Sequence, residues 1–251
     1  MIIGTKAGAG VKGGSLMISG CDNIAIRNMI IQDAYDPFPH HESGDGYNAQ
    51  YDCITVQNTC NYIWIDHCLI QDTLFDHVYV TTDTESGGTE TSEKWQTYDG
   101  LCDMKGDSHN ITVSNCIFKN HDKTMLIGPD DKAETFTDNK LRTITLVGNY
   151  FQNCVQRLPM VRNTNIHVVN NYYNFTKYNA TKKTGSTTAT EQISSSYAIG
   201  VRYGSQVYSE ANYFDTGIQY SYSGDSASKN GKIQIKFLDI PKRRAVLEDK
   251  I

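Results

Sequence analysis

The stretch Asn110-Ile-Thr-Val-Ser-Asn-Cys-Ile-Phe118 is one of six copies of a nine-residue motif. Its second and fourth positions are apolar in every copy except at Ser209, and they alternate with polar residues, which is the period of a half-buried strand. Positions eight and nine resume the apolar pattern after a polar bend. Each copy therefore predicts a strand, a tight bend and a second strand. The copies begin at Asn23, Tyr62, Asn110, Thr143, Asn165 and Gln206.

The spacing of the motif predicts how these strands are arranged. Its second positions are residues 24, 63, 111, 144, 166 and 207, and the shortest interval, from 144 to 166, is about one bare turn of a parallel β-helix. A further short apolar strand precedes each copy. We therefore predict an all-β fold, a right-handed single-stranded parallel β-helix of about six coils with three strands each, in one domain over residues 1–251. The preceding strands are residues 16–19, 54–57, 101–104, 125–128, 158–161 and 198–201.

The longer intervals contain polar excursions. They are residues 33–50, the Thr, Ser, Glu and Gly-rich residues 82–97, and the Lys, Thr and Ser-rich residues 176–195. Such segments are typical of solvated loops on a rigid scaffold, where functional residues often lie. We predict three solvated loops.

Composition limits the partners. The chain has 251 residues with 39% hydrophobic content, 23 Lys and Arg, and 28 Asp and Glu, which gives a net charge of -5. The protein has no overall positive charge that would attract nucleic acid, so any anion must be bound by a local group of cationic side chains. No apolar run approaches the ~18 residues of a membrane span, and residues 1–12 lack the order of a signal peptide. We expect neither a nucleic acid nor a membrane partner.

Seven cysteines occur without C-x-x-C spacing, which argues against a zinc site. We predict that most are small buried side chains. Cys68 and Cys116 share position seven in neighbouring copies, so a disulfide is conceivable. Two stacked thiols are the favoured interpretation.

Six charged residues lie in or beside the strands that precede the motif, and stacking the coils brings them to one side of the helix. Each alone could be a solvated surface charge. Together they indicate a site, because clustered carboxylates suit Ca²⁺ and arginine binds carboxylates with a two-pronged fork. The six are Asp52, Asp99, Asp103, Lys123, Arg157 and Arg162.

At these residues the sequence resembles the family 1 polysaccharide lyases, specifically the extracellular pectate lyases, from about Ile2 to Phe214. The matching motifs also occur in the family's order. They are Trp64-Ile-Asp-His-Cys68, Asp99-Gly-Leu-Cys-Asp103, His121-Asp-Lys-Thr-Met-Leu-Ile-Gly128, Arg157-Leu-Pro-Met-Val-Arg162 and His167-Val-Val-Asn-Asn171.

The resemblance implies a secreted monomer that cleaves unesterified polygalacturonate (pectate) by β-elimination with Ca²⁺ as cofactor and an alkaline optimum. It assigns calcium binding to Asp52, Asp99 and Asp103, proton abstraction to Arg157, and binding of substrate carboxylates to Lys123 and Arg162. Two alternatives stay open: a pectin lyase acting on methyl-esterified pectin, and a non-catalytic β-helix that binds acidic polysaccharide.

Other residues of the motifs receive plainer interpretations. Asp66 and His67 fall at a bend, where a hydrogen-bonded structural pair is favoured over catalysis. His167 has no obvious partner. His121 and Asp122 adjoin Lys123, and one interpretation is that they orient it.

The ends of the chain depart from the family. Members tend to be longer at both ends, and the tail, residues 229–251, is atypical. Both features favour a fragment of a longer protein.

Overall fold

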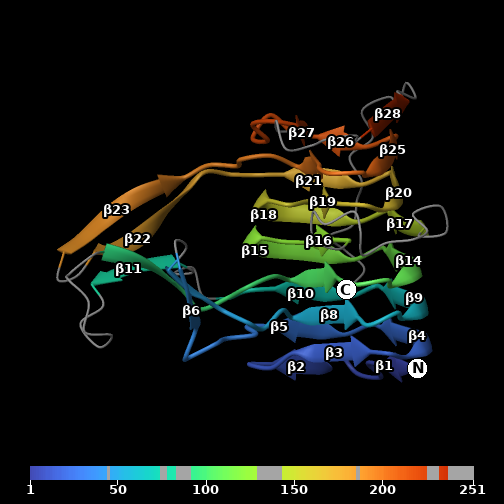
Figure 1. Ribbon diagram of the computed structural model, residues 1–251, viewed down its shortest axis with the longest axis horizontal. Coiled ribbons are helices and arrows are strands. Elements are labelled where there is room, and N and C mark those ends of the chain that lie inside the picture. Colours follow the sequence, from blue (N-terminus) through green and yellow to red (C-terminus); the bar gives the residue numbers. More distant parts are fainter. Residues whose placement is uncertain are drawn as a thin grey trace.

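A computed structural model shows an all-β protein (Figure 1). It describes residues 1–43, 46–73, 78–82, 92–128, 143–184, 187–224 and 232–236. These residues contain strands and no helix, and hence no helix long and apolar enough to cross a membrane. Three parallel sheets run the length of the molecule, and the chain visits them in turn in every coil. The predicted all-β parallel β-helix is confirmed.

The first sheet carries the first half of each motif. Its strands, in order, are β1 (Ile2–Ile3), β4 (Asp22–Arg27), β9 (Asn61–Asp66), β14 (His109–Ser114), β17 (Thr143–Val147), β20 (Asn165–Val169), β25 (Gln206–Glu210) and β28 (Lys232–Lys236). The second positions of the six copies are paired in one continuous register: Ile24, Ile63, Ile111, Ile144, Ile166 and Val207. The alignment predicted from the motif is therefore the register of the sheet.

The second sheet carries the second half of each motif, and the third sheet carries the preceding strands. The second comprises β2 (Gly10–Lys12), β5 (Ile30–Gln32), β10 (Leu69–Gln71), β15 (Ile117–Lys123), β18 (Tyr150–Gln156), β21 (Tyr172–Asn174) and β26 (Tyr213–Phe214). The third comprises β3 (Leu16–Ser19), β8 (Ile54–Gln57), β13 (Cys102–Met104), β16 (Leu126–Ile127), β19 (Met160–Val161), β24 (Ile199–Val201) and β27 (Tyr222–Gly224). The stack extends beyond the six predicted coils, because β1, β2 and β3 form a coil ahead of the first motif.

Like side chains stack inside the helix. The ring of Phe151 lies 5.0 Å from that of Phe118 below it and 4.9 Å from that of Tyr173 above it. At the polar bend, Asn149 donates its side-chain amide to Oδ1 of Asn171, at 3.0 Å. All of these side chains are buried. The stacked rings fill the interior, and the hydrogen bond between the amides pairs polar groups that would be costly to bury without a partner.

The cysteines behave as predicted. All seven are free thiols, and all except Cys21 are buried. The backbone N–H of Cys68 points to the sulfur of Cys116, at 3.4 Å. Cys68 and Cys116 are stacked thiols, as the sequence favoured.

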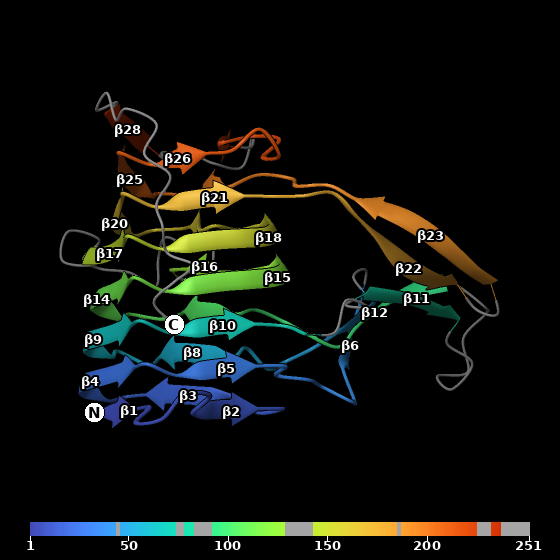
Figure 2. The ribbon, with the colours of Figure 1, turned by 180° about the vertical axis from the view of Figure 1, so that it is seen from behind.

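The prediction of three solvated loops is wrong for much of their length. Parts of them, together with residues 78–81, form a six-stranded side sheet that projects from one edge of the helix (Figure 2). Excursions that follow β5, β10 and β21 meet beside the helix, so their backbone groups can pair with one another. The strands, in order, are β23 (Thr187–Ile193), β22 (Tyr178–Thr184), β11 (Val78–Thr82), β12 (Ser92–Gln96), β7 (Gly46–Asn48) and β6 (His40–Glu42).

One part of the atypical tail belongs to the stack. Strand β28 pairs in parallel with β25 and continues the first sheet. The rest of the tail, residues 229–231 and 237–251, lies outside the described residues.

Candidate active site

Four of the six predicted site residues lie where the chain passes from the second sheet to the third, whereas Asp103 lies within β13 and Arg162 follows β19. Asp52, Asp99, Lys123 and Arg157 precede β8, β13, β16 and β19, which are neighbouring strands of the third sheet. Parallel strands are about 4.8 Å apart. The four side chains therefore start from successive coils along one edge of the helix. Asp103 lies one coil above Asp52, because it pairs with Thr55 on β8.

Asp52 and Asp103 share one counter-ion. The Nζ atom of Lys105 lies 3.0 Å from Oδ2 of Asp52 and 3.3 Å from Oδ2 of Asp103. The hydroxyl of Thr55 also donates to Oδ2 of Asp52, at 2.7 Å, and the backbone N–H of Leu126 donates to Oδ1 of Asp103, at 2.9 Å. Both carboxyl groups are buried, so their orientations are fixed from several sides.

The cluster is electrostatically strained without a further cation. Burial, followed by the negative charge of Asp52, raises the pKa of Asp103 to about 7, and Lys105 only partly opposes this. Burial also raises the pKa of Asp52, and Asp99 adds to the increase. Burial alone would lower the pKa of Lys105, but Asp103 and Asp52 raise it above its usual value. Two buried carboxylates thus share the ammonium group of Lys105, with the negative charge of Asp99 nearby, and added positive charge would stabilise their ionised forms.

The carboxylates fit Ca²⁺ by their chemistry. Oδ1 of Asp52 is buried and has no hydrogen-bond partner. A Cβ atom added to Gly100 would lie 2.7 Å from this oxygen and 2.7 Å from Oδ1 of Asp103, so both oxygens turn toward the same point. Within the described residues, no group of three or more His, Cys, Asp or Glu side chains is already arranged to hold a metal. Asp52, Asp99 and Asp103 would therefore have to share a calcium ion with water or substrate oxygens.

Asp99 is held through both its carboxylate and its backbone. The Nζ atom of Lys123 lies 3.1 Å from Oδ1 of Asp99. Nε2 of His121 lies 2.9 Å from the backbone oxygen of the same residue. The alternative that His121 and Asp122 orient Lys123 gains no support, because His121 contacts Asp99 and the carboxylate of Asp122 accepts from Gln156, at 3.0 Å.

Arg157 lies one coil above Lys123. Its backbone oxygen accepts from Met125 N, at 2.9 Å, and its φ of 59° is uncommon for a residue with a Cβ. The buried Nε atom of Arg157 has no hydrogen-bond partner. Tyr197 lies close to both Arg157 and Arg202. Burial raises the pKa of Tyr197, while the guanidinium groups of Arg202 and Arg157 oppose that rise.

Arg162 follows β19 directly. Its backbone N–H donates to Ile127 O, at 2.9 Å. Gly128, with φ of +95°, packs against the backbone oxygen of Arg162, where an added Cβ would collide. The close approach explains why a glycine ends the motif of residues 121–128.

Lys105 is a member of the site that the sequence interpretation missed. It lies two residues after Asp103, so the two side chains leave the extended chain on the same face. This two-residue spacing was the signal in the sequence that could have identified Lys105. The other ion partner, Asp52, is far away in sequence and comes close only because β8 and β13 are neighbours.

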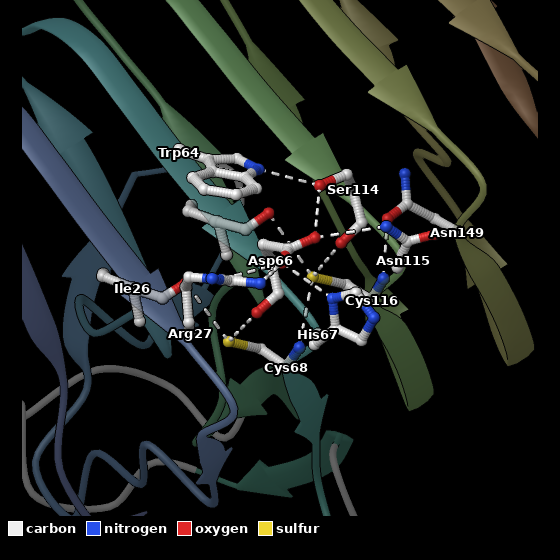
Figure 3. A network of polar contacts seen from close by, with 11 residues as sticks. Ile26, Arg27, Trp64, Asp66, His67, Cys68, Ser114, Asn115, Cys116 and Asn149 are labelled. Carbon is white, nitrogen blue, oxygen red and sulfur yellow. Dashed lines mark hydrogen bonds and ion pairs between the residues drawn. The ribbon is translucent and has the colours of Figure 1, made fainter. Parts of the chain in front are cut away.

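The Asp66–His67 pair belongs to a separate network on the first sheet (Figure 3). His67 Nδ1 lies 2.7 Å from Oδ2 of Asp66, and the hydroxyl of Ser114 donates to Oδ1 at 2.6 Å. Arg27 donates to the same carboxylate at 2.9 Å and covers the ring of Trp64 at 4.6 Å. The predicted hydrogen-bonded structural pair is confirmed.

His167 does have a partner, contrary to the prediction. Its Nε2 atom lies 2.9 Å from Oε1 of Glu210, on the adjacent strand β25. The partner was not visible in the sequence because it comes from the next coil.

Comparison with known proteins identifies the family. A family model described as "Pectate lyase" matches residues 1–239. The chain belongs to the pectate lyase family. It is 35% identical over 240 residues to pectate lyase A of Dickeya chrysanthemi, which covers 94% of this chain and 54% of that protein. It is 36% identical over 218 residues to a Bacillus subtilis pectate lyase, which covers 85% of this chain and 47% of that protein.

Solved pectate lyase structures share the fold. A mutant Bacillus subtilis pectate lyase matches with a TM-score of 0.70 and 32% identity, over 94% of this chain and 55% of that chain. A structure titled "Pectate lyase bound to hexasaccharide" matches with the same TM-score, identity and coverage. The chain spans about half the length of the pectate lyases it matches.

Proposed function

We propose that the protein is a Ca²⁺-dependent pectate lyase that cleaves unesterified (1→4)-α-D-galacturonan by β-elimination. The observation that supports this most strongly is the cluster of Asp52, Asp99 and Asp103 beside Lys123, in a chain of the pectate lyase family. The overall charge is -5, so the protein as a whole does not attract an anionic polymer. In this proposal the cationic side chains of the site bind it instead.

In this proposal Asp52, Asp99 and Asp103 hold the calcium ion. The buried oxygen of Asp52 that lacks a partner, and the raised pKa of Asp103, both indicate carboxylates that gain from an added cation. A bound Ca²⁺ supplies positive charge next to the uronate carboxylate, which stabilises the negative charge that develops when the C5 proton leaves. An unesterified carboxylate is needed for this interaction.

Arg157 is the proposed general base. It acts in its neutral guanidine form, because a guanidinium group has no lone pair to accept a proton. It takes the proton from C5 of a galacturonate, the C5–H electron pair forms a double bond to C4, and the C4–O4 bond breaks. The departing oxygen takes up a proton from water and becomes the hydroxyl of the other product. The result is an oligogalacturonide with a 4,5-unsaturated sugar at its new non-reducing end. The buried, unpartnered Nε of Arg157 is a polar group for which the protein supplies no acceptor.

Lys123 and Arg162 are the proposed substrate-binding residues. Lys123 already pairs with a carboxylate, Asp99, at 3.1 Å. A uronate carboxylate could take a similar position relative to this ammonium group. Arg162, on the coil above, supplies a fork that suits carboxylates. Lys105 adds a third cation next to the acidic cluster.

The setting of the reaction follows from its substrate. We propose that the protein works outside the cell, because polygalacturonate is a large polymer that does not cross membranes freely. We propose that it acts there as a monomer. We propose no nucleic acid or membrane partner.

The test is the substitution Arg157→Lys, assayed for binding and turnover of polygalacturonate. A lyase should lose turnover while it still binds the polymer, whereas a non-catalytic binding protein should bind as before and have no turnover to lose. A parallel assay uses methyl-esterified pectin with chelator present. Turnover there, and none on polygalacturonate with calcium, would establish the pectin lyase alternative.

A further inference from the structure

Two side chains of one strand contact the same acidic residue. His121 and Lys123 lie two residues apart on β15, so both point to the same side of the second sheet. Lys123 contacts the Asp99 carboxylate at 3.1 Å, and Nε2 of His121 contacts the Asp99 backbone oxygen at 2.9 Å. The backbone and the carboxylate of Asp99 are therefore placed by one rigid element.

The second ring nitrogen of His121 is fixed from the coil below. Its Nδ1 lies 2.5 Å from Oδ2 of Asp72, which directly follows β10. Both residues are almost completely buried, with relative exposures of 1%. The backbone N–H of Asp72 donates to Lys119 O on β15, so the two residues are also tied through their strands. Since a carbonyl oxygen can only accept, Nε2 is the donor to Asp99.

Asp99 needs such support more than the other two aspartates. Asp103 lies within β13, and Asp52 accepts from Thr55 and Lys105. Asp99 lies before β13 in a segment without regular structure, and its side chain is 24% exposed. A buried hydrogen bond to its backbone oxygen limits how far this segment can shift.

We propose that His121, braced by Asp72, is a positioning residue that holds the backbone of Asp99 so that its carboxylate faces Asp52 and Asp103. This inference rests on the proposed function, because it assigns His121 a part in calcium binding. His121 itself touches neither substrate nor metal. Residues that hydrogen-bond to metal ligands orient those ligands in many proteins, and their loss lowers metal affinity about 10- to 100-fold.

The test compares two amides at residue 121. In His121→Gln, the side-chain nitrogen can reach the Asp99 oxygen much as Nε2 does. In His121→Asn, the shorter side chain can reach Asp72 but not Asp99. Calcium affinity is measured without substrate by isothermal titration calorimetry, and Tm in chelator reports on folding. We expect His121→Asn to weaken calcium binding at least about tenfold, and His121→Gln to stay within about threefold of the wild type.

A matched control removes a histidine elsewhere. His167→Asn breaks the pair with Glu210 on the first sheet and should leave calcium affinity unchanged. If His121→Asn and His121→Gln lower Tm but bind calcium equally well, or equally poorly, the pair is only structural and the inference is wrong.

A second variant covers the case in which His121→Asn does not fold. Asp72→Asn keeps the shape and an acceptor for Nδ1 but removes the charge, and should weaken calcium binding at least about threefold; unchanged affinity overturns the inference. A wild-type protein that binds no calcium and turns over no polygalacturonate overturns the proposed function as well. Normal wild-type turnover with unaltered calcium binding in the variants overturns the inference alone.

Discussion

The Nζ atom of Lys105 lies 3.0 Å from Oδ2 of the buried Asp52. In this position the ammonium group neutralises part of a cluster that also contains Asp103 and Asp99. The protein thus carries a partial internal substitute for a bound cation. Because the neutralisation is only partial, we expect the stability of the acidic cluster to depend on an added cation.

Replacing Lys105 by methionine should destabilise the metal-free protein, because Asp52 and Asp103 lose their shared counter-ion while they stay buried. A hydrogen bond to a charged group contributes about 2 kcal/mol, and we expect a loss of about that size in the free energy of unfolding in chelator. Calcium should recover part of it. The measurement is Tm with chelator and with calcium, and the calcium-induced rise should be larger in Lys105→Met than in the wild type.

Lys12→Met is the control, since Lys12 is exposed on β2 in the first coil. An equal calcium-induced rise in Lys105→Met and in the wild type would contradict the role given to Lys105.

The stability of the metal-free protein should fall as the pH rises from about 4 to about 7. The pKa of Asp103 is raised to about 7 by burial and by Asp52, so the folded state holds a proton that the unfolded chain releases at lower pH. Stability falls with pH wherever the folded state binds more protons. Unfolding in chelator across this range checks the sign, and Asp103→Asn should show a smaller fall.

Calcium binding should show the opposite dependence, because the ion competes with the proton on Asp103. Calcium affinity should increase up to about pH 7 and then level off, with proton release on binding below that pH. Titration in buffers of different ionisation enthalpy measures the released proton. A pH-independent affinity would show that Asp103 is not a ligand.

Gly100→Ala should weaken calcium binding about tenfold, which corresponds to about 1.4 kcal/mol. The new Cβ would lie 2.7 Å from the Oδ1 atoms of Asp52 and Asp103 and would force them apart. Gly14→Ala is the matched control, since its Cβ would meet only Val11 at 3.4 Å. Calorimetric titration of both variants checks this, and unchanged affinity in Gly100→Ala would mean that these oxygens do not share a ligand.

Phe151→Ala should lower the free energy of unfolding by about 3–5 kcal/mol, because it leaves a cavity in the stack with Phe118 and Tyr173. Tyr150→Ala is the comparison, since that ring is only partly buried on the same strand and should cost less. Urea denaturation measures both. Equal losses would contradict the importance of the internal stack.

The sequence was sufficient to predict the coils. Ile24, Ile63 and Ile111 occupy the same motif position and the same row of the first sheet, because alternation of apolar and polar residues determines which side of a strand faces the core. The site aspartates and Lys123 were also predicted to converge, since each adjoins a strand of the third sheet. The contacts of Asp99 with Lys123 and of Lys105 with Asp52 and Asp103 agree with that prediction.

The sequence was insufficient for contacts between coils that lie outside the repeated motif. Asp72 and His121 are 49 residues apart, and nothing in the spacing of the motif marks them as partners. The side sheet was missed for the same reason, since β11 and β22 pair only after their coils have stacked. Such pairings depend on the three-dimensional path of each excursion, which local residue patterns do not determine.

The most direct test of the central claim is the ultraviolet absorbance of the conjugated unsaturated uronate during incubation of the folded protein with polygalacturonate at alkaline pH. Absorbance should increase in the presence of calcium, the increase should stop when chelator is added, and Arg157→Lys should show no increase. No increase with calcium from well-folded protein, or an increase that chelator leaves unchanged, would contradict this claim.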